Sequence, residues 1–226
     1  MMTDFKRKYA QLRDDLLTQG DRVVDVIHRS VEAYFGRDQA SADVIIEGDA
    51  IIDQADVDIE RASIKLLELG PTGEYDIRSV LTIVKINNEL ERIADGAVSI
   101  VEHLLPDGIE GELPRTYRVM ANSVVGMVRD ANNAMREKGS ELAQRVLAFD
   151  DTVDKFKAQL MEEAQSKLAA GEYSVPWAMS LLNLTRSLER IADHCTNVCE
   201  QLIYLETGKV VRHLPSGWTE PALPDS

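Results

Sequence analysis

The stretch that decides the fold is Leu-Glu-Arg-Ile-Ala-Asp at positions 90–95, because the same six residues return at positions 188–193. The likeness continues downstream of each copy, where Ser99 corresponds to Asn197 and Ile100 to Val198. An identity of six residues that extends into a patterned similarity indicates an internal duplication rather than coincidence. We therefore expect two related halves, displaced by 98 residues at this stretch.

Each copy has the spacing of an amphipathic helix. In the first copy, apolar residues recur at steps of three and four positions and form one face. Glu91, Asp95 and Glu102 lie at i, i+4 and i+11, so at about 100° per residue they fall within roughly 40° of each other. Earlier positions on the same line are the apolar Val80 and Val84. A line of this mixed character predicts that the face lies partly against a neighbouring helix.

Glycine and proline residues divide the chain into six helical segments, with breaks at 36, 70–73, 106–114, 139 and 171. The expected helices are 4–35, 39–69, 75–105, 115–137, 140–170 and a sixth that follows a Ser174 cap and runs to 206. Three amphipathic helices joined by short loops form an antiparallel bundle. The sequence therefore predicts an all-α fold of two tandem three-helix bundles. Residues 1–107 form the first repeat, 108–208 the second and 209–226 a tail.

Composition restricts the classes of function. The formal net charge is −14, which argues against nucleic acid because its binders carry a basic face. The first residues contain no apolar core of a signal peptide, and no apolar run reaches transmembrane length, so we expect no membrane insertion. The only cysteines, Cys195 and Cys199, lie four apart on a predicted helix and are interpreted as core residues of a cytoplasmic protein.

The middle helices also repeat a pair of carboxylates, since Asp49 and Asp53 correspond to Asp150 and Asp154 at a displacement of 101 residues. Like charges at i and i+4 on a helix repel by a few tenths of a kcal/mol, a cost that a bound cation removes. Oxygen ligands in such number suit hard or borderline cations such as Mg, Mn, Ca or Fe. The expected metal ligands are Asp49, Asp53, Glu91, Asp95, Asp150, Asp154, Glu189 and Asp193.

The alternative is a solvated acidic face, partly neutralised by Arg92, Arg190 or Lys85. The two halves also differ, because Glu60 in the second helix corresponds to Met161 in the fifth, so the two sites need not be equivalent. No Glu-x-x-His motif is present, which argues against a redox di-iron enzyme.

The order of these parts resembles the PhoU family, the phosphate-uptake regulators of bacteria, over residues 8–213. The resemblance is carried by Glu47-Gly-Asp49 with Asp53, by Asp76-Ile-Arg78 after Pro71, by the duplicated stretch itself, and by Gly208 with Arg212-His213. One departure is that alanines at positions 94 and 192 stand where the family usually has glycine. Both residues are small, so we interpret the change as a tolerated variation in packing.

The resemblance implies a non-catalytic regulator that links a phosphate ABC transporter to a membrane-bound sensor histidine kinase. It also implies a homodimer, and it implies metal binding through Glu/Asp-x-x-x-Asp pairs, with ligand types compatible with Fe, Mn, Mg or Zn. The alternative function is a carboxylate-bridged metal protein with hydrolase or storage activity, which needs an open coordination position and a pocket.

Overall fold

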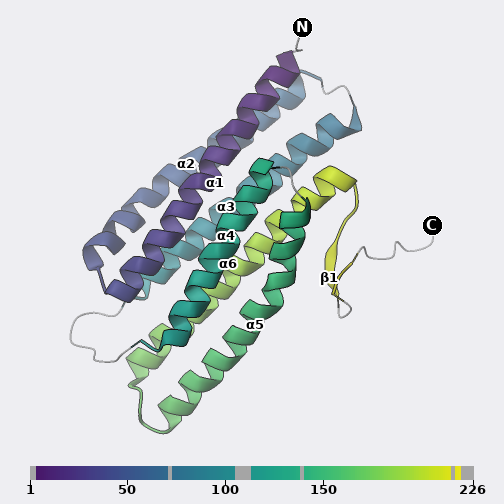
Figure 1. The fold of residues 1–226 in the computed structure, drawn as a ribbon. Helices are drawn as coiled ribbons and strands as arrows, with labels where there is room; N and C mark the ends of the chain where they lie inside the picture. Colours follow the sequence, from purple (N-terminus) through teal and green to yellow (C-terminus); the bar gives the residue numbers. More distant parts are fainter. Residues whose placement is uncertain (1–3, 71–72, 105–112, 138–139, 215–216, 220–226) are drawn as a thin grey trace.

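The computed structural model describes residues 4–70, 73–104, 113–137, 140–214 and 217–219, with side chains described up to Val211. The six helices in Figure 1 are α1 (Asp4–Gly36), α2 (Gln39–Glu68), α3 (Glu74–Glu102), α4 (Arg115–Glu137), α5 (Ser140–Ala169) and α6 (Val175–Thr207). The all-α prediction is confirmed, and each predicted helix end lies within three residues of the observed one. The predicted breaks at 71–72, 106–112 and 139 lie outside the described residues.

The helices pack as two three-helix bundles that lie side by side (Figure 1). In the first, α1, α2 and α3 contact one another; in the second, α4, α5 and α6 do the same. Across the boundary α3 packs against α6 and α1 against α4, so α2 and α5 lie on the two flanks. The buried apolar side chains of all six helices form one continuous cluster. The two repeats therefore share a core.

The crossing of α3 and α6 passes through the duplicated stretch. Ala94 and Ala192 are fully buried there, which explains why only small residues fit at these positions. Near them Gly96 lies against Ile191, and a β-carbon added at Gly96 would come within 2.6 Å of Ile191 Cγ1. Short side chains let two helix backbones approach closely, so this part of the repeat sets the distance between the halves.

The predicted helix ends rest on capping groups that the structure contains. Asp38 caps α2, where its carboxylate accepts a hydrogen bond from Ser41 N at 3.0 Å, and the Ser174 hydroxyl accepts one from Trp177 N at 3.4 Å at the start of α6. Gly171 ends α5 with a φ of 74°. The end of α1 differs in one detail, because the left-handed residue is Arg37, with a φ of 53°, rather than Gly36.

The tail contains a feature that the sequence did not predict. Two short antiparallel strands, β1 (Arg212–Leu214) and β2 (Gly217–Thr219), pair with His213 opposite Trp218. Strands of three residues are too short to produce a recognisable alternation of apolar and polar residues. The tail was therefore expected to lack periodic structure.

The interpretation of the two cysteines as core residues is confirmed. Cys195 and Cys199 are free and fully buried among the core side chains of α6, and Trp177 is also buried at the start of the same helix. Among the described residues, no helix combines the length and the hydropathy needed to span a bilayer.

Candidate metal centres

The first carboxylate cluster lies between α2 and α3 and contains Asp49, Asp53, Asp56, Glu91 and Asp95. Asp49 is partly buried, and its pKa is raised above the usual range by burial and by the negative charges of Asp53, Asp95 and Glu102. The two helices therefore bring their predicted pairs to one shared face, and Glu102 lies at its edge. This arrangement agrees with the expectation that the acidic line on α3 faces a neighbouring helix.

Two further carboxyls respond to the same crowding. Burial raises the pKa of Glu91, and the charges of Asp95, Asp56 and Asp53 add to the effect. Burial also raises the pKa of Asp56, although its carboxylate accepts a hydrogen bond from Asn87 Nδ2 at 2.6 Å. Raised pKa values in neighbouring acids mean that the cluster holds its negative charge at a cost, which a cation would relieve.

The counter-ion of this cluster is Arg92, and it lies at the periphery. Its Nε is 3.3 Å from Glu91 Oε2, and one of its terminal nitrogens is 3.4 Å from Asp95 Oδ2. These contacts are longer than a charge-assisted hydrogen bond, and 48% of the Arg92 side chain is exposed. Arg92 therefore screens the outer rim without filling the space between the carboxylates. Lys85, the other cation considered for this half, lies over the ring of Tyr204 instead.

Two oxygens of the first cluster lack a hydrogen-bond partner although they are buried. They are Asp49 Oδ1 and Glu91 Oε2, one from each helix. A buried carboxylate oxygen without a hydrogen bond loses hydration, which is unfavourable unless a cation or a water molecule supplies the missing contact, and Glu91 Oε2 has Arg92 Nε at 3.3 Å. Among the residues that the structure describes, no three His, Cys, Asp or Glu side chains converge as a ready coordination sphere.

The second carboxylate cluster lies between α5 and α6 and contains Asp150, Asp154, Glu189 and Asp193. Burial and the charge of Glu189 raise the pKa of Asp193, with a further contribution from Asp154. Asp150 lies one helical turn before Asp154 on α5, which puts the two carboxylates on the same face of that helix. The second half thus repeats the arrangement of the first.

One residue separates the two clusters. Lys157 of α5 forms an ion pair through Nζ with Glu189, and its pKa is raised chiefly by that hydrogen bond. At the displacement of 101 residues that aligns α2 with α5, Lys157 corresponds to Asp56. A cation therefore stands in the second cluster where the first has another carboxylate.

Asp56 and Lys157 are the residues that sequence reasoning missed. The candidate ligands were restricted to i, i+4 pairs that recur in both halves, and Asp56 belongs to no recurring pair because its counterpart is Lys157. Comparison of α2 with α5 position by position contains the signal, because it aligns an acid with a base next to the predicted ligands. Arg190, by contrast, was expected as a counter-ion and is exposed.

The histidine nearest the duplicated stretch has a structural partner. His194 Nδ1 lies 2.7 Å from Glu89 Oε2, and Asn197 Nδ2 donates to the same oxygen at 3.0 Å. These residues join α3 to α6 across the boundary between the halves. His194 thus faces α3, away from the side of α6 that carries the candidate ligands.

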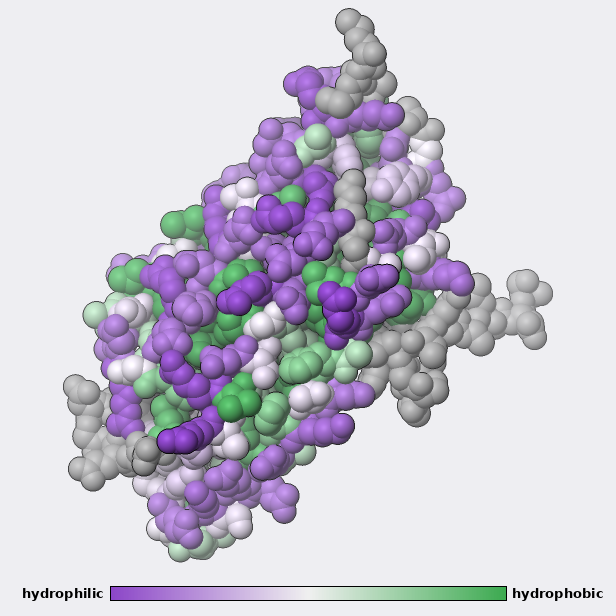
Figure 2. All heavy atoms as spheres, in the orientation of Figure 1, coloured by the Kyte–Doolittle hydropathy of each residue, from purple (hydrophilic) through white to green (hydrophobic). Residues whose placement is uncertain are grey.

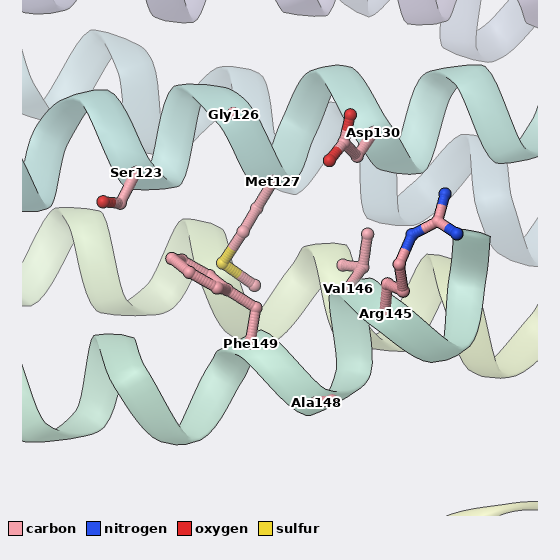
Figure 3. A pocket seen from close by; sticks show the side chains of 8 residues that line it. All are labelled: Ser123, Gly126, Met127, Asp130, Arg145, Val146, Ala148 and Phe149. Carbon is pink, nitrogen blue, oxygen red and sulfur yellow. The ribbon is translucent and has the colours of Figure 1, made fainter. Parts of the chain in front are cut away.

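An open groove between α4 and α5 offers a different kind of surface, with a volume of about 550 Å³ (Figure 3). Met127 and Phe149 project into it, while Asp130 and Arg145 lie together at one end. In the space-filling view, apolar residues gather between α4 and α5 on an otherwise largely hydrophilic face (Figure 2). The groove is lined by one acidic and one basic side chain, Asp130 and Arg145, so it has no net positive charge for an anion and does not compete with the carboxylates as a candidate ion site.

Comparisons with known proteins agree with the duplicated architecture. The PhoU domain model matches twice, at residues 16–104 and 117–202. The chain is 33% identical over 210 residues to a phosphate-specific transport system accessory protein PhoU homolog of Clostridium acetobutylicum, covering 92% of this chain and 96% of that protein. It is 28% identical to PhoU homolog 1 of Thermotoga maritima, covering 94% and 93%.

Solved structures give the same result for the fold. The crystal structure of the phosphate transport system regulatory protein PhoU from Streptococcus pneumoniae superposes with a TM-score of 0.86 at 26% identity, covering 92% of this chain and all of that one. PhoU from Pseudomonas aeruginosa superposes with a TM-score of 0.85 at 27% identity, covering 91% and 100%.

Proposed function

This chain belongs to the PhoU family of phosphate-transport regulators, and from that premise we propose that it acts as a non-catalytic adaptor in phosphate signalling. In this role it connects components of a phosphate ABC transporter with a sensor histidine kinase and keeps the phosphate regulon off when phosphate is plentiful. It acts in the cytoplasm as a homodimer.

The observation that carries this proposal is the match to the family over both repeats and over nearly the full length of its relatives. Those relatives are described as accessory or regulatory proteins of phosphate transport. Such descriptions favour regulation over the hydrolase or storage alternative.

The regulatory role is tested by deleting the gene in the bacterium that encodes it and measuring a phosphate-regulon reporter in phosphate-rich medium. We expect expression to rise to the level of starved cells and to return to the repressed level when the wild-type gene is restored. Purified protein should show no turnover of phosphate esters. Unchanged reporter expression in the deletion strain would contradict the proposal.

We further propose that the carboxylate clusters bind metal, and the first cluster fits this role best. Its donors are all oxygens, two of them are buried without a hydrogen bond, and its counter-ion Arg92 is half-exposed and contacts the carboxylates at 3.3 Å or more. Such a donor set suits Mg, Mn or Fe. The bound ion would supply a structural or sensing link between α2 and α3.

Melting curves test this metal site. A ligand that binds only the folded state raises stability by RT ln(1 + [L]/Kd), so wild-type protein should melt at a higher temperature with Mn²⁺ than with chelator. The double variant Glu91→Gln with Asp95→Asn should lose the part of that shift which the first cluster supplies. In chelator the same variant should be slightly more stable than wild type, by tenths of a kcal/mol, because repulsion is relieved. An equal Mn²⁺ shift in both proteins would show that this pair holds no ion.

A further inference from the structure

We infer that Lys157 is the resident cation of the second carboxylate cluster and that it makes this cluster a much weaker metal site than the first. The inference rests on the proposed metal binding, since it explains a difference between two candidate sites. It concerns a residue that belongs to this chain's second repeat and has no counterpart of the same charge in the first.

The position of Lys157 supports this role. Its ammonium group pairs with Glu189 and interacts with the charges of Asp154 and Asp193, so it acts on three of the four carboxylates in the cluster. About a third of its side chain is exposed, whereas Arg92 in the first half is exposed over nearly half. An ammonium group has a compact positive charge, as a small cation does, and its three N–H groups donate to carboxylate oxygens.

The hydrogen-bond inventory of the two clusters agrees with this difference. In the first cluster, Asp49 Oδ1 is buried without a hydrogen-bond partner, and Glu91 Oε2 makes no hydrogen bond but lies 3.3 Å from Arg92 Nε. The described residues include no buried oxygen of this kind in the second cluster. Glu189 is the counterpart of Glu91, and the group that satisfies it is Lys157. The second cluster therefore has its cation built into the chain.

A metal ion can enter the second cluster only by displacing this ammonium group. Both cations are attracted to the same oxygens and repel each other at short range, so Lys157 must leave before Glu189 and Asp193 can act as ligands. Breaking the Lys157–Glu189 pair costs free energy that is subtracted from the affinity for the ion. In the first cluster the corresponding contacts are those of Arg92 with Glu91 and Asp95, at the longer distances of 3.3 and 3.4 Å, so an ion that enters there displaces a more weakly held cation.

The test counts bound Mn²⁺ in the full-length protein by the electron paramagnetic resonance signal of the free ion. The variant Lys157→Met keeps the length of the side chain and removes its charge, and Lys157→Arg is the matched control that keeps the charge. We expect Lys157→Met to bind additional Mn²⁺ with a Kd at least about tenfold below that of the second cluster in wild type. Lys157→Arg should bind as wild type does, and Lys157→Met with Asp193→Asn should lose the added ion.

Thermal melts give an independent readout. In chelator Lys157→Met should melt below wild type, because the remaining carboxylates repel, and Mn²⁺ should restore more of its stability than it adds to wild type. If Lys157→Met does not fold, Lys157→Gln takes its place. The inference is overturned if neither variant binds more Mn²⁺ than wild type, or if wild type already fills the second cluster as tightly as the variant. Equal Mn²⁺ binding by wild type and by Glu91→Gln with Asp95→Asn would instead overturn metal binding at the first cluster, while the gain in Lys157→Met still decides the role of Lys157.

Discussion

Glu89 shows how a single side chain can connect the two halves. Burial alone raises the pKa of this carboxyl, but hydrogen bonds from His194 and Asn197 lower it overall. The counterpart of Glu89 in α6 is Ser187, whose hydroxyl donates to Ser99 Oγ at 3.2 Å, and Ser99 is the counterpart of Asn197. The boundary therefore repeats the same pair of contacts about a pseudo-two-fold axis, as in an isologous interface, but with different chemistry on each side.

The lowered pKa of Glu89 predicts a pH effect. Because its folded pKa lies below the ordinary value of 4.5, the stability it contributes is present above that value and is lost as pH falls through the folded pKa. We expect Glu89→Gln to reduce the free energy of unfolding at neutral pH by about 1 kcal/mol. As pH falls, wild type loses the contribution of the Glu89 carboxylate, so the difference in stability between the two proteins should narrow. Urea unfolding between pH 7 and pH 3 measures this.

Asp49→Asn is the control with the opposite sign. The folded pKa of Asp49 is raised above the ordinary value of 3.8. In chelator, its charge therefore destabilises the folded state increasingly as pH rises from that ordinary value to the folded pKa. The free energy of unfolding of Asp49→Asn should therefore increase relative to that of wild type as pH rises. The same pH dependence in both variants would show that their carboxyls do not differ as described.

At the scale of the helices, the sequence predicted most of the architecture. The 3.6-residue period and the glycine and proline breaks located six helices, and the duplication grouped them into two bundles. The sequence also allowed the carboxylates of α2 and α3 to be assigned to one site, because neighbouring antiparallel helices can turn their i, i+4 carboxylate pairs toward each other. Contacts between residues far apart in sequence could not be predicted. The left-handed conformation at Arg37 accompanies a contact of its guanidinium with the ring of Trp177 at 5.2 Å, across 140 residues of sequence. The charge of Lys157 can be read from the sequence, but its ion pair with Glu189 depends on how α5 packs against α6.

The end of α5 gives a matched pair of glycine variants. Gly171 has a positive φ, which a β-carbon disfavours, whereas Gly36 is helical and has open space around it. We expect Gly171→Ala to lower the free energy of unfolding by about 1 kcal/mol or more, and Gly36→Ala to leave it unchanged or raise it by up to about 1 kcal/mol. Chemical denaturation of both variants measures the difference. Equal effects would contradict the assigned helix end.

At the scale of the whole molecule, the two repeats are not separable units. α3 and α6 bury their duplicated stretches against each other, and α1 packs against α4. A half on its own would expose apolar side chains that the other half now covers. The acidic clusters, in contrast, lie between a central helix and a flanking helix within each half, so neither cluster takes a carboxylate from the other half.

The shared core predicts one cooperative transition. We expect hydrogen exchange in α2 and α5 to reach the same protection limit, because global unfolding exposes both flanks together. Gly171→Ala, a change in the second half, should lower protection in α2 as much as in α5. Slow exchange retained in α2 alone would indicate that the first repeat can stay folded without the second.

The pseudo-two-fold axis at the α3–α6 crossing has a consequence for how such a protein can evolve. In an assembly of two identical short chains, every replacement appears twice, so a lysine that closed one acidic site would close the other as well. Joining the repeats in one polypeptide releases them from this symmetry. The paired positions 56 and 157 are then free to drift apart, and one ancestral site can specialise in receiving an ion while its twin becomes a permanent internal bond.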